Sequence, residues 1–239
     1  MSSCQVIRKA KPSFIKGDSA SAVYSFSTNK WTHHKTHKKI ESKTSRKVLD
    51  ISWLKYASDA YDVSDNPRDY VIAEVPVVTV DIPNRNLDCF VFEEVSRWSP
   101  ILGRMVYQSF IGKPTFANHD NKDPRKAKGV NFDAVLRKVG RIYKIFVLSG
   151  FDRTKDPALA DKIHRQILNR FSMGAFVDTA LCSVHERPVG PPPAVCCSSQ
   201  KGDIVNGVLR YDICLGVNYV ENSSVEDPAD IFAWTPEIW

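Results

Sequence analysis

A serine and a histidine in turn-rich segments are the side chains of this sequence best suited to chemistry. Ser172 lies in the stretch RFSMGAF, and His119 lies in the polar stretch GKPTFANHDNKDP. A serine hydroxyl is a poor nucleophile until a base takes its proton, and histidine often serves as that base because its pKa lies near neutrality. The two residues are therefore candidates for acyl transfer. Taken singly, each also has an ordinary interpretation, as a surface-loop histidine and as a serine at the start of a strand.

The remaining histidines divide between a basic tail, a helix and one further loop. His33, His34 and His37 lie among lysines, where a solvated cluster is expected rather than a metal site. His164 lies in a predicted helix. His185 lies in a loop and is the second histidine whose surroundings suit catalysis.

Cysteines around His185 suggest two other chemistries. Cys182-x-x-His185 resembles half of a zinc site, but the neighbouring Cys196 and Cys197 do not easily bind one tetrahedral ion together, and a second ligand pair is absent. A cysteine hydrolase built on Cys182 and His185 is disfavoured, because residues three positions apart would not easily meet. We therefore predict no metal and no cofactor. The six cysteines show no regular spacing and are expected to be reduced thiols.

The elements that must position these residues are mostly strands. Dense β-branched residues predict a buried strand over 70–80, and further strands are expected over 106–110, 130–136, 142–148 and 171–179. The first of these, YVIAEVPVVTV, is the clearest. Ser172 would then lie at the start of a strand, and His119 in a loop over 112–128. Residues 186–206 are expected to be a surface insertion, and 207–220 a final strand or strand pair.

Two helices are predicted beside these strands. One is short, over 90–98, and the other runs from Pro157 to about Arg170, with proline at its first position and Asp156 as its cap. Strands and helices do not alternate as regular βαβ units. We therefore expect an α+β fold with a mostly antiparallel sheet or barrel flanked by helices.

Charge separates the N-terminal segment from the rest of the chain. Residues 1–47 carry eleven Lys or Arg and two acids, a net +9, so that the remainder of this +6 chain carries −3. The segment is also poor in aliphatic residues, which favours a flexible tail or a removable propeptide. A basic tail on an acidic body indicates an electrostatic partner, and charge alone does not choose between nucleic acid and an acidic protein.

No membrane segment is predicted. The sequence has no run of 18 apolar residues, and MSSCQVIRKAKPSF lacks the apolar stretch of a secretory signal. We therefore expect the protein to stay in the compartment where it is made. Hydrophobic residues make up 43% of the 239 residues, which is enough for a substantial core.

Several short motifs, in this order, resemble a known family. GKPTFANHDN followed by DPRKAKG, then FSMGA followed by CS, together with VPVVTVDIPNRN, resemble the prohead (capsid maturation) serine proteases of large tailed phages. The resemblance runs from about residue 70 to 220. The wider family is similar to the herpesvirus assembly proteases. The resemblance implies a Ser-His catalytic pair on a β-barrel flanked by helices.

The resemblance also implies roles for particular residues. The serine of the family's S-x-G motif matches Ser172, and the base of its HD motif matches His119. Its third member is an acid on a later strand, which in RYDICLG corresponds to Asp212. The spacing departs from the family, since 40 positions separate Asp212 from Ser172 and about half of that is expected. In the herpesvirus relatives the third member is a histidine, so His185 is the alternative.

Substrates and partners follow from the same resemblance. They would be the scaffold or core proteins and the capsid protein inside the immature phage head, in the host cytoplasm, with a homodimer implied by the herpesvirus relatives. Related proteases often cut after Glu with a small residue two places earlier, which Ser224-Val225-Glu226 matches. We therefore expect a protease domain over 48–226 and self-cleavage after Glu226 that removes 227–239. The alternative is a non-enzymatic head-structural or nucleic-acid-binding protein that uses the basic tail.

Overall fold

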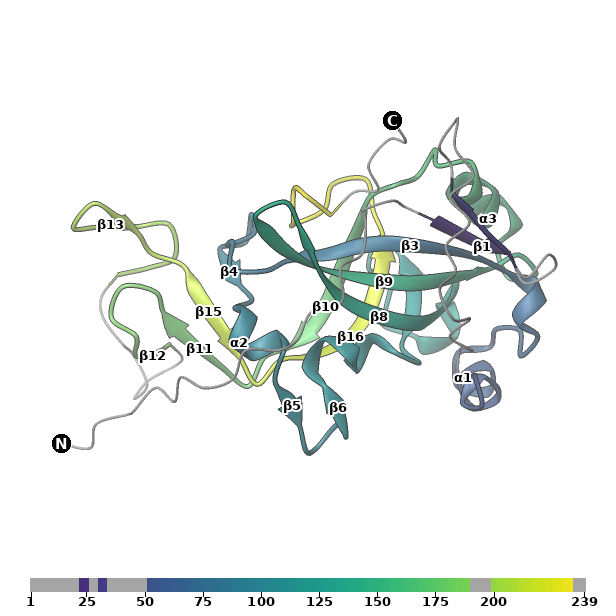
Figure 1. The fold of residues 1–239 in the computed structure, drawn as a ribbon, viewed down its shortest axis with the longest axis horizontal. Coiled ribbons are helices and arrows are strands. Elements are labelled where there is room, and N and C mark those ends of the chain that lie inside the picture. The colour runs from purple at the N-terminus through teal and green to yellow at the C-terminus, as the bar shows by residue number, and fades with distance from the viewer. Residues whose placement is uncertain (1–21, 26–29, 34–50, 190–198, 234–239) are drawn as a thin grey trace.

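The computed structural model describes residues 22–25, 30–33, 51–189 and 199–233, which form two main β-sheets with short helices at their margins (Figure 1). The larger sheet has the strand order β10-β16-β7-β8-β9-β3-β1-β2, antiparallel throughout except for the parallel pair β16 and β7. Its strands are β1 (Ala22–Ser25), β2 (Lys30–His33), β3 (Tyr70–Thr79), β7 (Pro114–Ala117), β8 (Gly129–Val139), β9 (Ile142–Asp152), β10 (Phe171–Phe176) and β16 (Asn218–Ser224).

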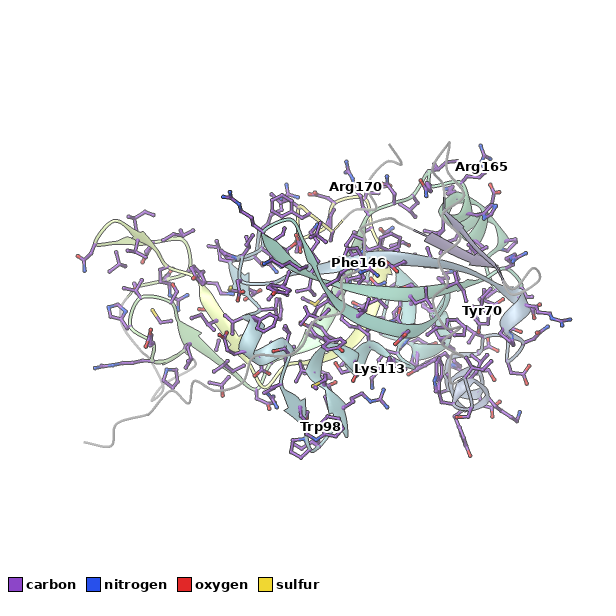
Figure 2. All side chains as sticks on the ribbon, viewed as in Figure 1. Tyr70, Trp98, Lys113, Phe146, Arg165 and Arg170 are labelled. Carbon is purple, nitrogen blue, oxygen red and sulfur yellow. The ribbon has the colours of Figure 1, made fainter. Side chains whose placement is uncertain are left out.

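The smaller sheet has the order β12-β11-β15-β4 and lies at the end of the molecule away from α1 and α3 (Figure 1). Its strands are β4 (Asp88–Cys89), β11 (Thr179–Cys182), β12 (Pro188–Val189) and β15 (Asp212–Leu215). Two hairpins stand apart from both sheets: β5 (Trp98–Ser99) with β6 (Arg104–Met105), and β13 (Ile204–Val205) with β14 (Val208–Leu209). Figure 2 shows Trp98 projecting from the first hairpin, and 58% of this residue is exposed.

The helices are short. They are α1 (Leu54–Tyr61), α2 (Phe92–Val95), α3 (Pro157–His164) and the 3₁₀ helices η1 (Pro67–Asp69), η2 (Val106–Phe110) and η3 (Pro124–Lys126). Helix α3 begins as expected, because the Asp156 side chain accepts a hydrogen bond from the Leu159 N–H and Pro157 occupies the first turn. The helix ends at His164 rather than near Arg170. Gln166 adopts a left-handed φ of 58°, and a right-handed helix cannot continue through a residue in that conformation.

Strand β3 is the centre of the core. All of its residues except Glu74 are buried, which explains the dense β-branched sequence of this strand. On one face, Val71 and its alternate residues join the main apolar cluster with Ile163 of α3. On the other face, Ile72 packs in a second cluster with Leu54 of α1. Both faces of the sheet are therefore covered at β3.

The predicted strands in the middle of the chain are confirmed. The expected strands over 70–80, 130–136 and 142–148 correspond to β3, β8 and β9, and β8 and β9 are longer than expected. The mixed composition with a predominance of strands is also confirmed. The large sheet curls so that β10 contacts β3, but these strands do not pair. The described strands therefore do not close into a barrel.

Other expected elements were wrong. Residues 106–110 form the 3₁₀ helix η2, because Val106 and Phe110 bury their side chains at a spacing that a helical turn brings to one side. The expected loop over 112–128 contains β7 and η3, and the helix expected over 90–98 is reduced to α2. The strand expected over 171–179 ends at Phe176, and 207–220 divides among β14, β15 and the start of β16. Helix α1 was not anticipated.

The basic N-terminal segment contributes two strands to the large sheet. Strand β1 pairs with β2 and with β3, through Val23 opposite Ala73 and Tyr24 opposite Ile72. The other residues of 1–47, expected to form a flexible tail or propeptide, lie outside the described residues.

Candidate active site

Ser172 is the second residue of the edge strand β10. It lies directly opposite Ser223 of β16, and only 8% of the residue is exposed. Its neighbour Phe171 is buried in the main core and donates its N–H to the Ala233 carbonyl at 3.0 Å. Ser172 therefore lies at the start of a strand, as expected from the sequence, and its neighbour anchors that strand in the core.

His119 lies in the turn that follows β7. The parallel pairing of β7 with β16 continues one step beyond the strand, because the Asn118 N–H donates to the Ser224 carbonyl at 2.9 Å. Asn118 and His119 then both adopt left-handed φ values, of 51° and 54°. Such conformations are uncommon outside glycine and concentrate at functional sites. The turn points the imidazole back toward β16.

Glu221 of β16 is the acid that contacts this histidine. Its Oε1 accepts a hydrogen bond from His119 Nδ1 at 2.8 Å, and its Oε2 accepts one from the Ser223 hydroxyl at 2.6 Å. Only 2% of the Glu221 side chain is exposed, whereas 41% of the His119 side chain is. A buried carboxylate thus fixes one nitrogen of a half-exposed imidazole, and among the described residues no hydrogen bond is made by the other nitrogen.

The pKa of His119 is raised above its usual value of 6.5. The main cause is the hydrogen bond to Glu221, whose negative charge also favours the imidazolium, while partial burial opposes the shift. The imidazolium is therefore the favoured form over a wider pH range than in a free histidine.

Gly174 makes room for the Glu221 carboxylate. The two residues lie opposite each other in the β10–β16 pair, and a Cβ atom added at Gly174 would lie 2.6 Å from Glu221 Oε1 and 2.9 Å from its Cγ. Any side chain at this position would therefore collide with the acid that holds His119. The glycine of Ser-x-Gly is explained by this contact between two strands.

Ser172 and His119 line one pocket of about 850 Å³. Its walls include residues of β10, the turn at 84–86, the segment 177–180 and residues 227–230. Within the described residues, Ser172 Oγ makes no hydrogen bond to His119; such bonds often tighten only when substrate binds. The nucleophile and base expected from the sequence are brought to the same cavity.

The segment after β16 forms one wall of this pocket and is attached at several points. Arg85 forms an ion pair with Asp227, and its backbone N–H donates to the Ala229 carbonyl at 2.9 Å. The Asp230 carboxylate accepts from the Thr79 N–H. The wall is thus tied both to the turn at 84–86 and to the end of β3.

Asp212, expected as the third catalytic member, lies elsewhere. It is part of β15 in the smaller sheet, where its carboxylate pairs with Arg210 at 2.6 Å and with Lys201 at 3.3 Å. Only 3% of Arg210 is exposed, so this pair neutralises a buried cation. The structure gives Asp212 a place in the charge balance of that sheet, and it is Glu221 that contacts His119.

His185, the alternative third member, contacts Cys182 instead. Its Nδ1 lies 3.4 Å from Cys182 Sγ, across the turn that follows β11. The expectation that these two residues would not meet was therefore wrong, because the turn folds one back on the other. The residue Cys182 is fully buried. Cys196 and Cys197 lie outside the described residues, and within the described part of the chain no group of three or more potential ligands could hold a metal ion.

Glu226, the expected self-cleavage position, is exposed and lies two residues after the end of β16. Its carbonyl accepts a hydrogen bond from the guanidinium of Arg170 at 2.8 Å (Figure 2). Residues 227–230, just beyond it, are among those that line the pocket. The chain on one side of the expected cleavage position therefore reaches the candidate site.

Sequence reasoning missed Glu221. The acid lies 49 positions after Ser172, beyond the strand on which an acid was sought. The sequence of the last strand, NYVENSS, gives no local signal, because a polar strand is ordinarily exposed; only the structure shows that its residues from Glu221 to Ser224 are all buried. Buried polar runs of this kind are rare and point to a function.

Comparison with known proteins identifies no relative. No protein-family model matches this sequence, and no curated protein or solved structure is significantly similar to it. In the described residues, no helix is both long and apolar enough to cross a bilayer.

Proposed function

We propose that this protein is a serine endopeptidase in which Ser172 is the nucleophile, His119 the base and Glu221 the acid that orients the base. The observation that carries the proposal is the 2.8 Å hydrogen bond between His119 Nδ1 and buried Glu221, made beside the pocket that Ser172 lines. A serine, a histidine and a carboxylate with these roles are the recurring parts of acyl-transfer sites on unrelated folds.

The proton positions follow from the Glu221 contact. An ionised carboxylate only accepts hydrogen bonds, so neutral His119 carries its proton on Nδ1 and has a free lone pair on Nε2. Nε2 takes the Ser172 proton as Oγ attacks a peptide carbonyl, and the imidazolium returns that proton to the leaving amine. Water then attacks the acyl-enzyme with His119 again as base.

The substrate class comes from the resemblance to prohead proteases. We propose that the substrates are scaffold or core proteins and the capsid protein of an assembling phage head in the host cytoplasm, and that the fold is a variant of that of the herpesvirus assembly proteases. A homodimer is part of the same proposal. The resemblance to prohead proteases is supported by the order of the motifs around His119 and Ser172 and by the contact between Gly174 and Glu221.

Self-cleavage after Glu226 belongs to this proposal. It is supported by the exposure of Glu226 and by the position of the following residues at the pocket. Intact-mass spectrometry of the wild type beside Ser172→Ala tests it: loss of 227–239 from the wild type alone is expected. A wild type that cuts other proteins but keeps this segment would contradict it.

The activity itself is tested with a fluorophosphonate probe, which forms a bond to an activated serine with loss of fluoride. We expect labelling of the wild type on Ser172, identified by peptide mass, and none of Ser172→Ala or His119→Ala. Labelling of unfolded wild type is the control for non-specific reaction. A folded wild type that resists both the probe and self-cleavage would favour the non-enzymatic alternative, a structural or nucleic-acid-binding protein.

A further inference from the structure

A second serine lies beside the candidate nucleophile and has no part in the reaction described above. Ser223 is directly opposite Ser172 in the β10–β16 pair, and Glu221 is directly opposite Gly174. Side chains two residues apart on a strand lie on the same face of the sheet. Ser223 therefore occupies the same face of the sheet as Glu221 and, as the direct partner of Ser172, the same face as the candidate nucleophile.

The Ser223 hydroxyl is committed to the Glu221 carboxylate. Its Oγ donates to Oε2 at 2.6 Å, within the range of a strong hydrogen bond to a charged acceptor. Ser223 is fully buried and Glu221 is 2% exposed, so water cannot readily replace this donor. A buried carboxylate oxygen that loses its donor is costly, which makes the contact persistent.

The two oxygens of Glu221 have different partners. Oε1 binds His119 and Oε2 binds Ser223, so rotation of the carboxylate would break both hydrogen bonds. We propose that Ser223 is a positioning residue that fixes the Glu221 carboxylate, and through it the imidazole of His119, in the orientation that acyl transfer needs. This inference rests on the proposed function.

The neighbouring serine provides a matched control. Ser224 is also buried on β16, but it lies on the opposite face of the strand and its hydroxyl donates to the Phe116 carbonyl at 3.4 Å. Ser223→Ala and Ser224→Ala each remove one buried hydroxyl from adjacent positions. A purely structural role would make the two variants behave alike.

The test measures two properties of each full-length variant. One is the second-order rate of fluorophosphonate labelling at Ser172 as a function of pH. The other is the titration of the His119 ring followed by NMR. We expect Ser223→Ala to lower the rate at least about tenfold, since a misdirected base transfers protons poorly. We also expect the pKa of His119 to move back toward 6.5, because the hydrogen bond to Glu221 is the main cause of its raised value.

Ser224→Ala should stay within about twofold of the wild type in rate, because it leaves the hydrogen-bonded geometry of the site intact. If Ser223→Ala does not fold, Ser223→Cys keeps the shape and replaces a strong donor by a weak one, and the same losses are expected in smaller degree. A folded Ser223 variant that matches Ser224→Ala in rate and in the pKa of His119 would overturn the inference. If the wild type is not labelled at all, the proposed function fails, while the His119 titration still decides whether Ser223 holds the Glu221–His119 pair.

Discussion

Replacing Gly174 by alanine should disable the site through a single methyl group. The added Cβ would lie 2.6 Å from Glu221 Oε1, and ordinary contact begins at 3.4 Å, so the carboxylate must retreat by about 0.8 Å. A retreat of that size is enough to stretch the 2.8 Å hydrogen bond to His119 beyond the usual limit of about 3.2 Å. Because a misplacement of about 1 Å can cost a hundredfold in rate, we expect labelling of Ser172 to slow about a hundredfold.

Stability must be separated from reactivity in this experiment. Overpacking at Gly174 should lower the free energy of unfolding by about 1–3 kcal/mol, measured by denaturant titration. Gly140→Ala is the matched control, because Gly140 has a left-handed φ of 60° with no atom within 4 Å of an added Cβ. It should cost about 1–2 kcal/mol of backbone strain. The control should label at the wild-type rate.

The refuting result is specific. If folded Gly174→Ala labels Ser172 as fast as Gly140→Ala does, then the Glu221 contact does not govern the reactivity of Ser172. The explanation given for the glycine of Ser-x-Gly would then be wrong.

Four further predictions concern the charged groups. Glu221→Gln should slow labelling of Ser172 by up to about ten-thousandfold, the effect of replacing the acid of a serine-protease triad by the corresponding amide, because the amide favours the wrong tautomer of His119. In the wild type, labelling should rise with pH with a midpoint above 6.5, and in Glu221→Gln the midpoint should return toward 6.5, as rate–pH profiles would show. Because folding raises the pKa of His119, the stabilisation that comes from protonated His119 is complete below pH 6.5 and is lost as the pH rises through the raised pKa. Denaturant titrations at several pH values should therefore show that the free energies of unfolding of the wild type and Glu221→Gln become equal at alkaline pH. Asp212→Asn should leave labelling unchanged but lower the free energy of unfolding by on the order of 2 kcal/mol, because buried Arg210 loses its ionic partner; slowed labelling in a folded Asp212→Asn would restore Asp212 as a candidate for the acid.

The sequence predicted the parts of the site that depend on local motifs. Ser172 was expected at the start of a strand and His119 in a turn-rich segment, and both positions follow from residues close to them in the chain. Which acid meets His119 depends instead on the parallel pairing of β7 with β16, across 102 residues. Nothing local to Glu221 announces that pairing, and a glutamate in a polar strand is ordinarily exposed.

The same distinction explains the fold. Strands β3, β8 and β9 were predicted because dense β-branched residues fix their conformation locally. The segment Val106–Phe110, VYQSF, has only one β-branched residue and forms a 3₁₀ helix, because a short, partly apolar segment suits either conformation and its tertiary contacts decide. Asp212 was correctly expected on a strand, but the sequence could not tell that this strand belongs to the smaller sheet.

Residues 227–230 line the pocket and carry two of its charges, so cleavage of the chain before this wall would change the charge of the pocket. Asp227 and Asp230 are two of the four aspartates that line the pocket. Asp227 also forms an ion pair with Arg85, the one arginine among the described residues that line the pocket. A chain cut after Glu226 that lost this wall would have a wider opening, two fewer negative charges and an unpaired guanidinium at its rim. Long and trimmed forms of the protein would therefore attract different peptides, with the trimmed form better suited to acidic ones.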